Sequence, residues 1–377
     1  MIPDPLPGLL LIGGDTKAGP LSSVDNSPKL GFPADCVIPE LPEKRYGAGA
    51  FITHKGLSVC GGWWEGKPYS TDCLTLKVNK AKGRWERGHL DDMPEEAGGV
   101  KGVISLKGNG VYLVHGSSIS FMAENKTNWE AQQETPIADI QCAVKIAELS
   151  FLIFGGRTLK SVREFSITQA AETRSGYGRQ KMRSQTQGEW QNIYRWPSLQ
   201  QDRRGPGCGA TAEILIVAGG ISGWEDVLDT VEVYQLKSRS LGVGEKMIQA
   251  RAFFSLVPVG ETFIRLLAVG GEGLNGTLNT TEWWNNDNND WREGPELDTP
   301  RSSLAFSIVP VNLVCSDTTD DVFCHTEQNN TCNACKKEGD NFVCSLGTAS
   351  DEKCVVEKCP IHLEEERAPE LDPQKTG

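Results

Sequence analysis

The sequence has little of what would assign it to several common functional classes. It contains only five histidines in 377 residues, and no two of them stand at the spacing of metal ligands. No apolar run approaches the roughly 18 residues that a membrane-spanning helix needs. Acidic residues outnumber basic ones by 50 to 38, and the net charge of −12 argues against a nucleic-acid-binding surface. We therefore expect neither a membrane span nor a nucleic-acid partner.

Catalytic sequence motifs are missing as well. The chain has no Gly-x-Ser-x-Gly elbow, no His-Glu-x-x-His and no phosphate-binding glycine loop. The clusters Gly98-Gly99 and Gly270–Gly273 fit strand turns better than phosphate sites. The opening residues Met1–Asp4 show no basic region and no apolar segment, so no signal peptide is visible. We expect no cofactor, no bound metal and no enzymatic activity.

What the sequence does contain is a repeated glycine pair that ends a short apolar run. The copies end at Gly13-Gly14, Gly61-Gly62, Gly155-Gly156, Gly219-Gly220 and Gly270-Gly271, with a degenerate copy at His115-Gly116. Their spacing scatters around 50 residues, a period typical of propeller blades. Each run predicts a buried inner strand, because glycine permits a crowded turn near a propeller axis.

Other features recur around each glycine pair. A basic residue and a second apolar strand precede the pair, and a strand with alternating apolar positions follows it. A tryptophan and a Pro-containing turn then close most units; the tryptophans are Trp85, Trp129, Trp190 and Trp291. The unit is therefore predicted to hold four short strands separated by turns.

This pattern resembles the kelch repeat, most closely at Glu282, Trp284, Trp291, Pro300 and Arg301. The resemblance spans roughly residues 8–314, and it implies an all-β, six-bladed kelch-type propeller over residues 1–314. The strand Leu9–Gly14 lacks a preceding partner, and the strand Ser303–Val311 lacks a following one. We predict that these two pair and close the ring, which removes the exposed sheet edges of an open array. The outer strands of this closing blade are expected around Asp35–Ile38.

The twelve cysteines indicate an oxidising compartment. Cys60 and Cys73 fall on adjacent antiparallel strands, which makes a bridge plausible. Cys142 and Cys208 fall on the first strands of neighbouring blades and could join them. Cys36 and Cys315 would both belong to the closing blade, so we pair them.

The remaining cysteines lie in a short tail, which we interpret as a disulfide module over residues 315–360, followed by a disordered acidic segment over 361–377. They are Cys324, Cys332, Cys335, Cys344, Cys354 and Cys359. The spacing from Cys324 to Cys344 resembles the start of a plexin–semaphorin–integrin module, although the Gly-Trp-Cys that usually follows is absent. A growth-factor-like knot and a zinc site at Cys332 and Cys335 are the alternatives.

Glycosylation sequons agree with a secreted or extracellular protein. Four acceptor asparagines lie in polar turns, at Asn125, Asn275, Asn279 and Asn329.

A binding function is the best-supported interpretation of the loops. Propeller ligands commonly dock where loops converge around the channel. The candidate rim residues are Arg45, Arg204, Arg251, Arg301, Trp63, Trp64, Tyr69 and Trp224, with Arg203 beside Arg204. In related intracellular kelch adaptors, arginines in this loop bind acidic peptides. The alternative is that the arginines pair with blade carboxylates such as Glu282.

Attractin-like extracellular kelch proteins are the nearest resemblance. It implies a non-catalytic extracellular scaffold that binds a protein or glycan partner. Some propellers of this type are galactose-oxidase-like copper enzymes, and an intracellular kelch adaptor is the remaining possibility. The isolated histidines, including His115 in place of a turn glycine, favour the scaffold.

Overall fold

The computed structural model describes most of the chain. The described residues are 8–34, 36–64, 70–79, 82–94, 99–106, 108–131, 135–168, 187–191, 195–223, 226–259, 265–285, 289–315, 332–338, 341–346 and 353–355. Two compact units, Met1–Ser316 and Asp317–Gly377, make up the chain. Cys315 therefore belongs to the first unit.

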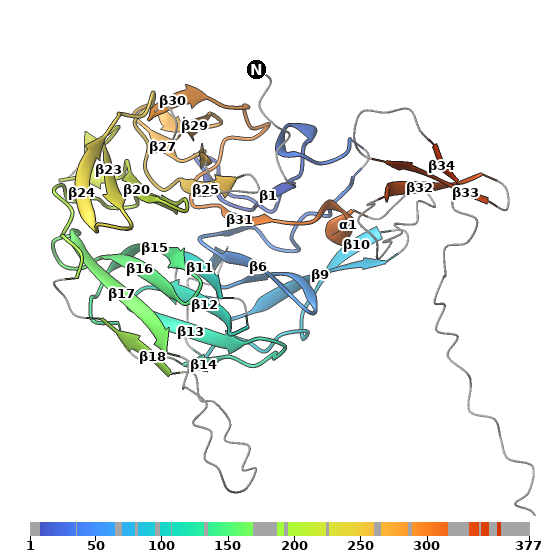
Figure 1. Ribbon diagram of the computed structural model, residues 1–377, viewed down its shortest axis with the longest axis horizontal. Helices are drawn as coiled ribbons and strands as arrows, with labels where there is room; N and C mark the ends of the chain where they lie inside the picture. Colours follow the sequence, from blue (N-terminus) through green and yellow to red (C-terminus); the bar gives the residue numbers. More distant parts are fainter. Residues whose placement is uncertain are drawn as a thin grey trace, which may run out of the picture. The chain divides into compact units, whose positions relative to one another are not determined.

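The first unit is an all-β propeller of six sheets arranged in a ring, as the repeat predicts (Figure 1). Blade 2 contains β6 (Gly49–Thr53), β7 (Gly56–Cys60), β9 (Cys73–Asn79) and β10 (Lys82–Glu86). Blade 3 contains β11 (Val100–Leu106), β12 (Gly110–His115), β13 (Ser118–Ala123) and β14 (Glu130–Ala131). Blade 4 contains β15 (Ile140–Ala147), β16 (Ser150–Gly155), β17 (Ser161–Thr168) and β18 (Gln187–Trp190).

The next two blades repeat this antiparallel four-stranded order. Blade 5 contains β19 (Gly207–Ala210), β20 (Ile214–Ala218), β23 (Val231–Gln235) and β24 (Ser240–Gly244). Blade 6 contains β25 (Ser255–Val259), β26 (Arg265–Val269), β29 (Thr281–Asn285) and β30 (Asp290–Glu293).

Blade 1 joins the two ends of the ring, which confirms the predicted closure. Its strand order is β31 (Ala305–Ile308), β1 (Leu9–Ile12) and β4 (Val24–Asp25). β1 and β31 are antiparallel, with Leu9 opposite Ile308 and Ile12 opposite Ala305. The expectation of outer strands around Asp35–Ile38 is wrong, because the third strand is β4 and a 3-10 turn, η1 (Pro28–Leu30), follows it. The short helix α1 (Val311–Val314) comes after β31.

The order of strands within a blade also corrects one expectation. The strand that ends in the glycine pair is the second of each blade, as β26 is in the order β25-β26-β29-β30. The strand before it lines the central channel, with residues of β6, β11, β15, β19, β25 and β31 contributing to the wall. The glycine pairs therefore lie one strand away from the axis.

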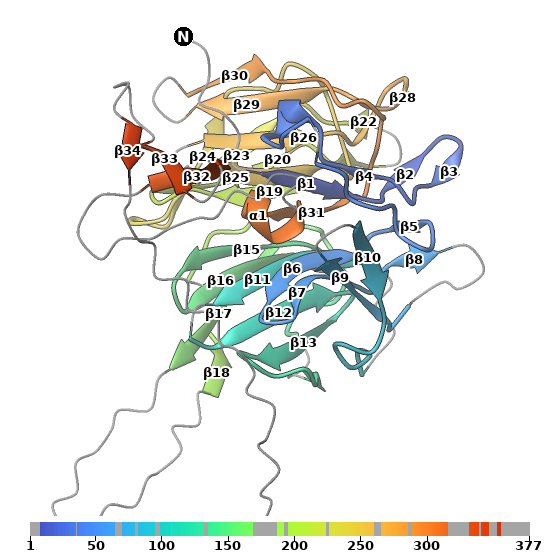
Figure 2. The same ribbon diagram turned by 90° about the vertical axis from the view of Figure 1, so that its right-hand side faces the viewer.

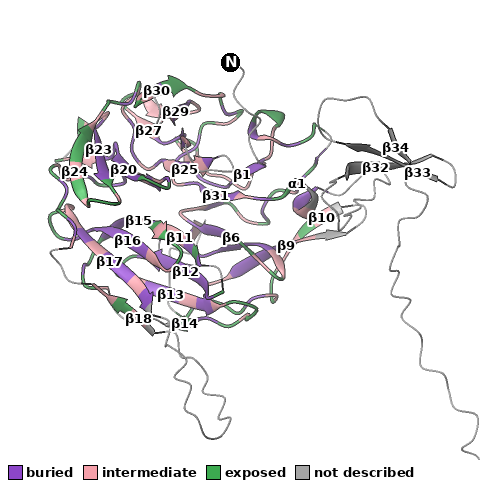
Figure 3. Cartoon of the chain, in the orientation of Figure 1, coloured by how far each residue is buried: buried purple, intermediate pink, exposed green. Residues whose placement is uncertain are grey.

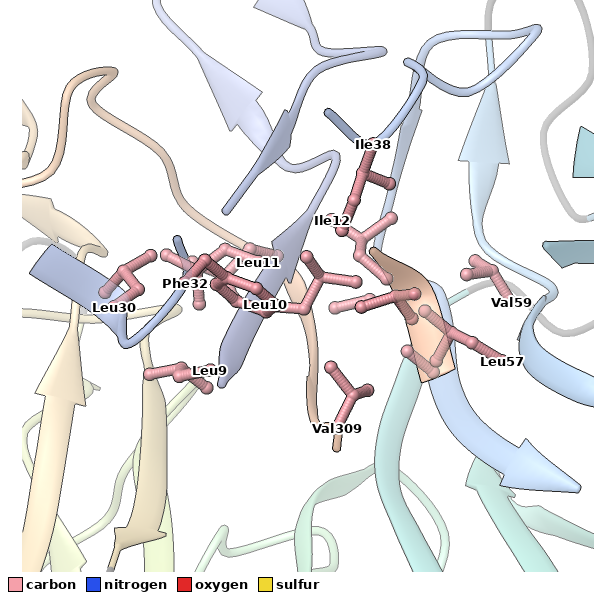
Figure 4. Close-up of a cluster of buried hydrophobic side chains, with 14 of the residues drawn as sticks. Leu9, Leu10, Leu11, Ile12, Leu30, Phe32, Ile38, Leu57, Val59 and Val309 are labelled. Atoms are coloured by element: carbon pink, nitrogen blue, oxygen red, sulfur yellow. The ribbon is translucent and has the colours of Figure 1, made fainter. Parts of the chain in front are cut away.

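The cores lie between neighbouring blades. Figure 3 shows the burial along the inner strands and the exposed outer strand β24. In the closing blade, all four residues of β1 are buried, and they belong to one cluster with Leu57 and Val59 of blade 2 (Figure 4). Leu267 of blade 6 belongs to the same cluster. The closing strands thus share one apolar cluster with the blades on both sides, and this makes the ring cooperative.

Three disulfides reinforce the propeller, and they are the pairings expected from the sequence. Cys60–Cys73 lies within blade 2, and Cys142–Cys208 joins the inner strands of blades 4 and 5. Cys36–Cys315 spans a sequence separation of 279 residues and ties the start of the ring to its end. These bridges indicate an oxidising environment.

The second unit contains a three-stranded sheet, β32 (Cys332–Glu338), β33 (Asn341–Leu346) and β34 (Lys353–Val355). Cys344 stands opposite Cys335 on one neighbouring strand and opposite Cys354 on the other. Cys324, Cys359 and the segment 361–377 lie outside the described residues. Within the part of the chain that the structure describes, no helix is long and apolar enough to cross a membrane.

Candidate binding site at the channel mouth

The propeller encloses a central cavity of about 830 Å³. Its wall consists of the first strand of every blade, so the cavity follows the axis of the ring. It is large enough for a small molecule or for one segment of a larger partner. We therefore took this channel and the loops around its mouth as the candidate site.

One residue per blade, just before each inner strand, has a left-handed backbone. These residues are Gly47, Gly99, Asp139, Gly205, Phe253 and Ser303, with φ between 48° and 95°. Five of the six, all except Asp139, line the cavity together with their neighbours. They form a belt of similar turns at the end of the channel where the inner strands begin.

Hydrogen bonds connect this belt from blade to blade. Phe253 N donates to Gly205 O at 2.7 Å, and Ser303 N donates to Phe253 O at 2.8 Å. Gly47 N then donates to Ser303 O at 2.7 Å, and Val100 N donates to Gly47 O at 2.6 Å. Main-chain bonds thus link blades 5, 6, 1, 2 and 3 in succession around the mouth.

The side chain of Gln141 makes the link between blades 4 and 5. Its Nε2 donates to the backbone oxygen of Asp139 at 3.1 Å and to Asp139 Oδ1 at 3.0 Å. Its Oε1 accepts from Gly205 N at 3.0 Å. Among the described residues, no bond joins the turn at Gly99 to the turn at Asp139, so the belt itself is interrupted there; Ile140 N donates instead to Gly116 O of blade 3 at 3.0 Å.

Buried arginines clamp the loops that lead into four of the blades. Arg251 Nη1 donates to Gly270 O at 2.7 Å and to Thr280 O at 3.1 Å, and its Nη2 lies 2.5 Å from Glu282 Oε1. Glu282 also accepts from the backbone N of Ile248 and Gln249. The arginine therefore joins the glycine turn, the third strand and the incoming loop of blade 6. Burial lowers the pKa of Arg251, and the carboxylate of Glu282 opposes that shift.

The same clamp recurs with small variations. Arg203 donates to Gly219 O at 2.8 Å and pairs with Glu232 at 3.1 Å. Arg45 donates to Gly61 O and pairs with Asp72, both at 3.0 Å. Arg301 closes the ring differently, since it donates to Gly13 O at 3.0 Å across 288 residues without a carboxylate in hydrogen-bond contact.

These contacts correct the rim assignment of three arginines. Arg45, Arg251 and Arg301 are at most 1% exposed, and their guanidinium groups bond to their own blades. They cannot present these groups to a partner. The alternative interpretation, in which the arginines bond within their own blades, is the correct one for them. Arg204 differs, because its side chain is exposed while the adjacent Arg203 occupies the clamp position.

Four short β-hairpins or strand pairs stand on the face that carries the mouth. They are β2 (Asp15–Thr16) with β3 (Gly19–Pro20), β5 (Arg45–Tyr46) with β8 (Trp63–Trp64), β21 (Ile221–Ser222) with β22 (Asp226–Val227), and β27 (Glu272–Gly273) with β28 (Gly276–Thr277). Figure 2 shows them together on one side of the ring. They belong to blades 1, 2, 5 and 6, the blades that hold arginine clamps. In the described part of blades 3 and 4 no such ribbon follows the second strand, so the wall is low there.

The predicted aromatic candidates have different outcomes. Trp63 lines the cavity and stacks on Tyr46, with ring centroids 6.0 Å apart and planes inclined by 11°. Burial, with a smaller effect of Asp15, raises the pKa of Tyr46. Trp64 lies in β8, but its side chain is not among the described ones, and Tyr69 and Trp224 lie outside the described residues.

The charged side chains that line the cavity are both lysines. Lys101 lies at the start of β11 and Lys145 lies near the end of β15, where its Nζ donates to Ser105 O at 3.1 Å. No aspartate or glutamate is among the described lining residues. Burial lowers the pKa of Lys101, and Asp139 partly offsets this shift. No sequence motif marks Lys101, Gln141 or Tyr46, because only the closed ring brings them to one mouth.

Other candidate groups lie away from this site. His115 is buried, and its Nε2 lies 2.9 Å from Ser120 Oγ. Among the described residues, no three His, Cys, Asp or Glu side chains cluster so as to hold a metal ion. Asn125 and Asn275 are exposed and Asn279 is half-buried, whereas Asn329 lies outside the described residues.

Comparisons with known proteins agree with the fold. No protein-family model matches the sequence. No curated protein matches it either. A solved structure, "Structure of YjhT", is similar with a TM-score of 0.50 at 12% identity, and the match covers 78% of this chain and 98% of that one. At this level of identity the similarity supports the propeller fold and carries no function with it.

Proposed function

We propose that this chain is a non-catalytic, extracellular kelch-type scaffold that binds a protein or glycan partner on the face around the channel mouth. The observation that carries the proposal is the set of four two-stranded ribbons on blades 5, 6, 1 and 2, the blades whose loops are held by buried arginines. We call this set the crescent. A rigid frame with projecting loops is the usual way in which propellers present a binding surface. The disulfides and the sequons support an extracellular location.

The composition of the crescent suits recognition. Trp63 and Tyr46 form a half-buried aromatic pair beside the mouth. Arg204 is exposed, and its backbone forms an antiparallel bridge with Ile221 of the ribbon on blade 5. Aromatic residues and arginine are enriched where proteins meet partners. Leu274, which is 77% exposed at the turn between β27 and β28, adds an apolar contact point on the same face. We infer that a partner contacts the raised side of the rim, over blades 5, 6, 1 and 2.

The experiment applies the purified full chain to arrays of extracellular glycans and of secreted ectodomains. We expect saturable binding to a restricted set, with the affinity reduced about tenfold or more by Trp63→Ala or Arg204→Glu. Arg84→Glu is the matched control, because Arg84 is 73% exposed on the outer strand β10, away from the rim. Equal losses in Arg204→Glu and Arg84→Glu would place the contact elsewhere or make it a net-charge effect.

The alternative of a galactose-oxidase-like enzyme is separated by metal analysis of the purified protein. Stoichiometric copper would contradict the scaffold. The alternative of an intracellular adaptor is separated by thiol counting under non-reducing conditions. Free thiols at the six bridged cysteines would contradict the extracellular location.

A further inference from the structure

The inside of the channel has a chemistry different from that of the rim. On β11, both Val103 and Ile104 line the cavity; Ile104 is 2% exposed, whereas Val103 is half-buried. On β31, Phe306 and Ile308 are likewise half-buried beside the buried Ala305. These half-buried apolar side chains border the cavity and also pack against the clusters between the blades. The wall is therefore largely apolar.

Three polar side chains of this wall are bonded to the protein itself, whereas the hydroxyl groups of Tyr46, Ser105, Ser303 and Ser307 also line it. Gln141 is held by Asp139 and Gly205, and Ser255 Oγ donates to Leu304 O at 3.5 Å. Lys145, towards the other end, already donates to Ser105 O. A ligand with many hydroxyl groups would find partners only at these few hydroxyl groups, since the rest of the wall is apolar.

Lys101 is the charged side chain of this wall that differs from Lys145. It is half-buried at the mouth end of the cavity, and no hydrogen bond or ion pair joins its ammonium group to another described residue. The nearest opposing charge, Asp139, has its carboxylate bonded to Gln141. Lys101 also lies at the boundary between blades 3 and 4, where the belt of hydrogen bonds is interrupted and the rim is low. Partial burial makes an unpaired ammonium less favourable than in water, and an anion bound there would offset that cost.

We propose that the channel is a binding site for an amphiphilic monocarboxylate, whose carboxylate pairs with Lys101 and whose apolar body lies along Val103, Ala143 and Phe306. Four residues of extended strand separate Lys101 from Ser105, which corresponds to about 13 Å of channel. That length suits a medium-length alkyl chain or an aromatic acid. An apolar pocket with one convergent polar group is the usual form of a small-molecule site.

The test titrates the purified full chain with decanoate, with its neutral counterpart 1-decanol and with the polar acid gluconate. Calorimetry gives affinities, and the ¹³C resonance of [1-¹³C]decanoate reports the environment of the carboxylate. We expect decanoate to bind about 10- to 100-fold more tightly than decanol, the range expected for a charge-assisted contact. Gluconate is expected to bind more weakly than decanoate, because the channel offers it few hydrogen-bond partners.

Variants locate the effect. Lys101→Met should reduce decanoate affinity to about that of decanol, whereas Lys101→Arg, which keeps the charge, should retain affinity within about threefold. Lys160→Met removes the same charge outside the cavity, where Lys160 donates to Gln200 O, and should leave affinity unchanged. The proposal is overturned if decanoate does not bind, if decanol or gluconate binds as tightly, or if Lys101→Met binds decanoate like the wild type.

Discussion

Arg251 Nη2 lies 2.5 Å from Glu282 Oε1, and neither side chain is more than 3% exposed. This ion pair does more than join two residues, because Glu282 also accepts from Ile248 N in the loop that enters blade 6 and Arg251 also donates to Gly270 O in the glycine turn. The equivalent pair of Arg203 and Glu232 bonds the loop that enters blade 5 in the same way. The rim loops are thus fixed to the blades by buried charge.

Replacing the arginine should therefore be costly. We predict that Arg251→Met lowers the free energy of unfolding by about 3–5 kcal/mol, because it leaves Glu282 as a buried charge without its main partner. Arg292→Met is the control, since Arg292 and Asp290 form an exposed pair that contributes at most about 1 kcal/mol. Both are measured by denaturant unfolding under non-reducing conditions. Similar losses in the two variants would show that the clamp contributes no more than a surface pair.

The disulfide across the ring closure makes a second prediction. Removing Cys36–Cys315 with paired serine substitutions should cost about 5–6 kcal/mol, because the bridge closes a loop of 279 residues. Removing Cys60–Cys73, with a separation of 13 residues, should cost about 3 kcal/mol. Denaturant midpoints of the two double variants give the comparison. If both lose the same amount, the pairing of β1 with β31 alone already restrains the ends of the unfolded chain.

The sequence predicted the ring because its main determinants are local. An apolar run before two glycines forms a strand and a turn in each blade. The unmatched strands near Leu9 and Ser303 could complete a blade only by pairing with each other, as they do. The arginines were ambiguous for a physical reason. A basic residue before a strand fits a rim contact and a clamp equally well, and only burial separates the two. The similar sequence separation between arginine and carboxylate, 31 residues for Arg251 and 29 for Arg203, was the available indication of a clamp.

The channel chemistry could not be obtained from sequence. Lys101 and Gln141 lie in strands that show no distinctive motif, and their roles depend on which residues of other blades meet them. Gln141 matters because Gly205, 64 positions away, lies beside it. In blade 1 the sequence prediction failed within the fold itself. Its strand β4 has only two residues, and its sequence pattern is too weak to distinguish it from the loop around Ile38.

Two glycines with the same backbone allow a controlled test of the belt. Gly205 has φ 63°, and a Cβ added there would lie 2.4 Å from the ring of Phe253. Gly223 has φ 61°, with nothing within 4 Å of an added Cβ. We predict that Gly223→Ala costs about 1 kcal/mol from backbone strain alone, and that Gly205→Ala costs about 2–4 kcal/mol because a steric clash adds to it. Thermal unfolding of both variants measures the difference, and equal shifts would show that Phe253 moves aside without cost.

The unpaired ammonium of Lys101 makes a prediction for the ligand-free protein. Burial lowers the pKa of Lys101 below its ordinary value of 10.5, so the charged form is disfavoured in the folded state. Lys101→Met should therefore stabilise the empty protein at pH 7, by about 0.5–2 kcal/mol. As the pH rises through the lowered pKa towards 10.5, the folded state loses the proton before the unfolded state does, so the wild type gains stability relative to the variant. The difference in unfolding midpoint should accordingly shrink between pH 7 and pH 10. A variant that is less stable than the wild type at pH 7 would mean that the ammonium already has a favourable partner within the protein, and the channel would then lack the free cation on which anion binding depends.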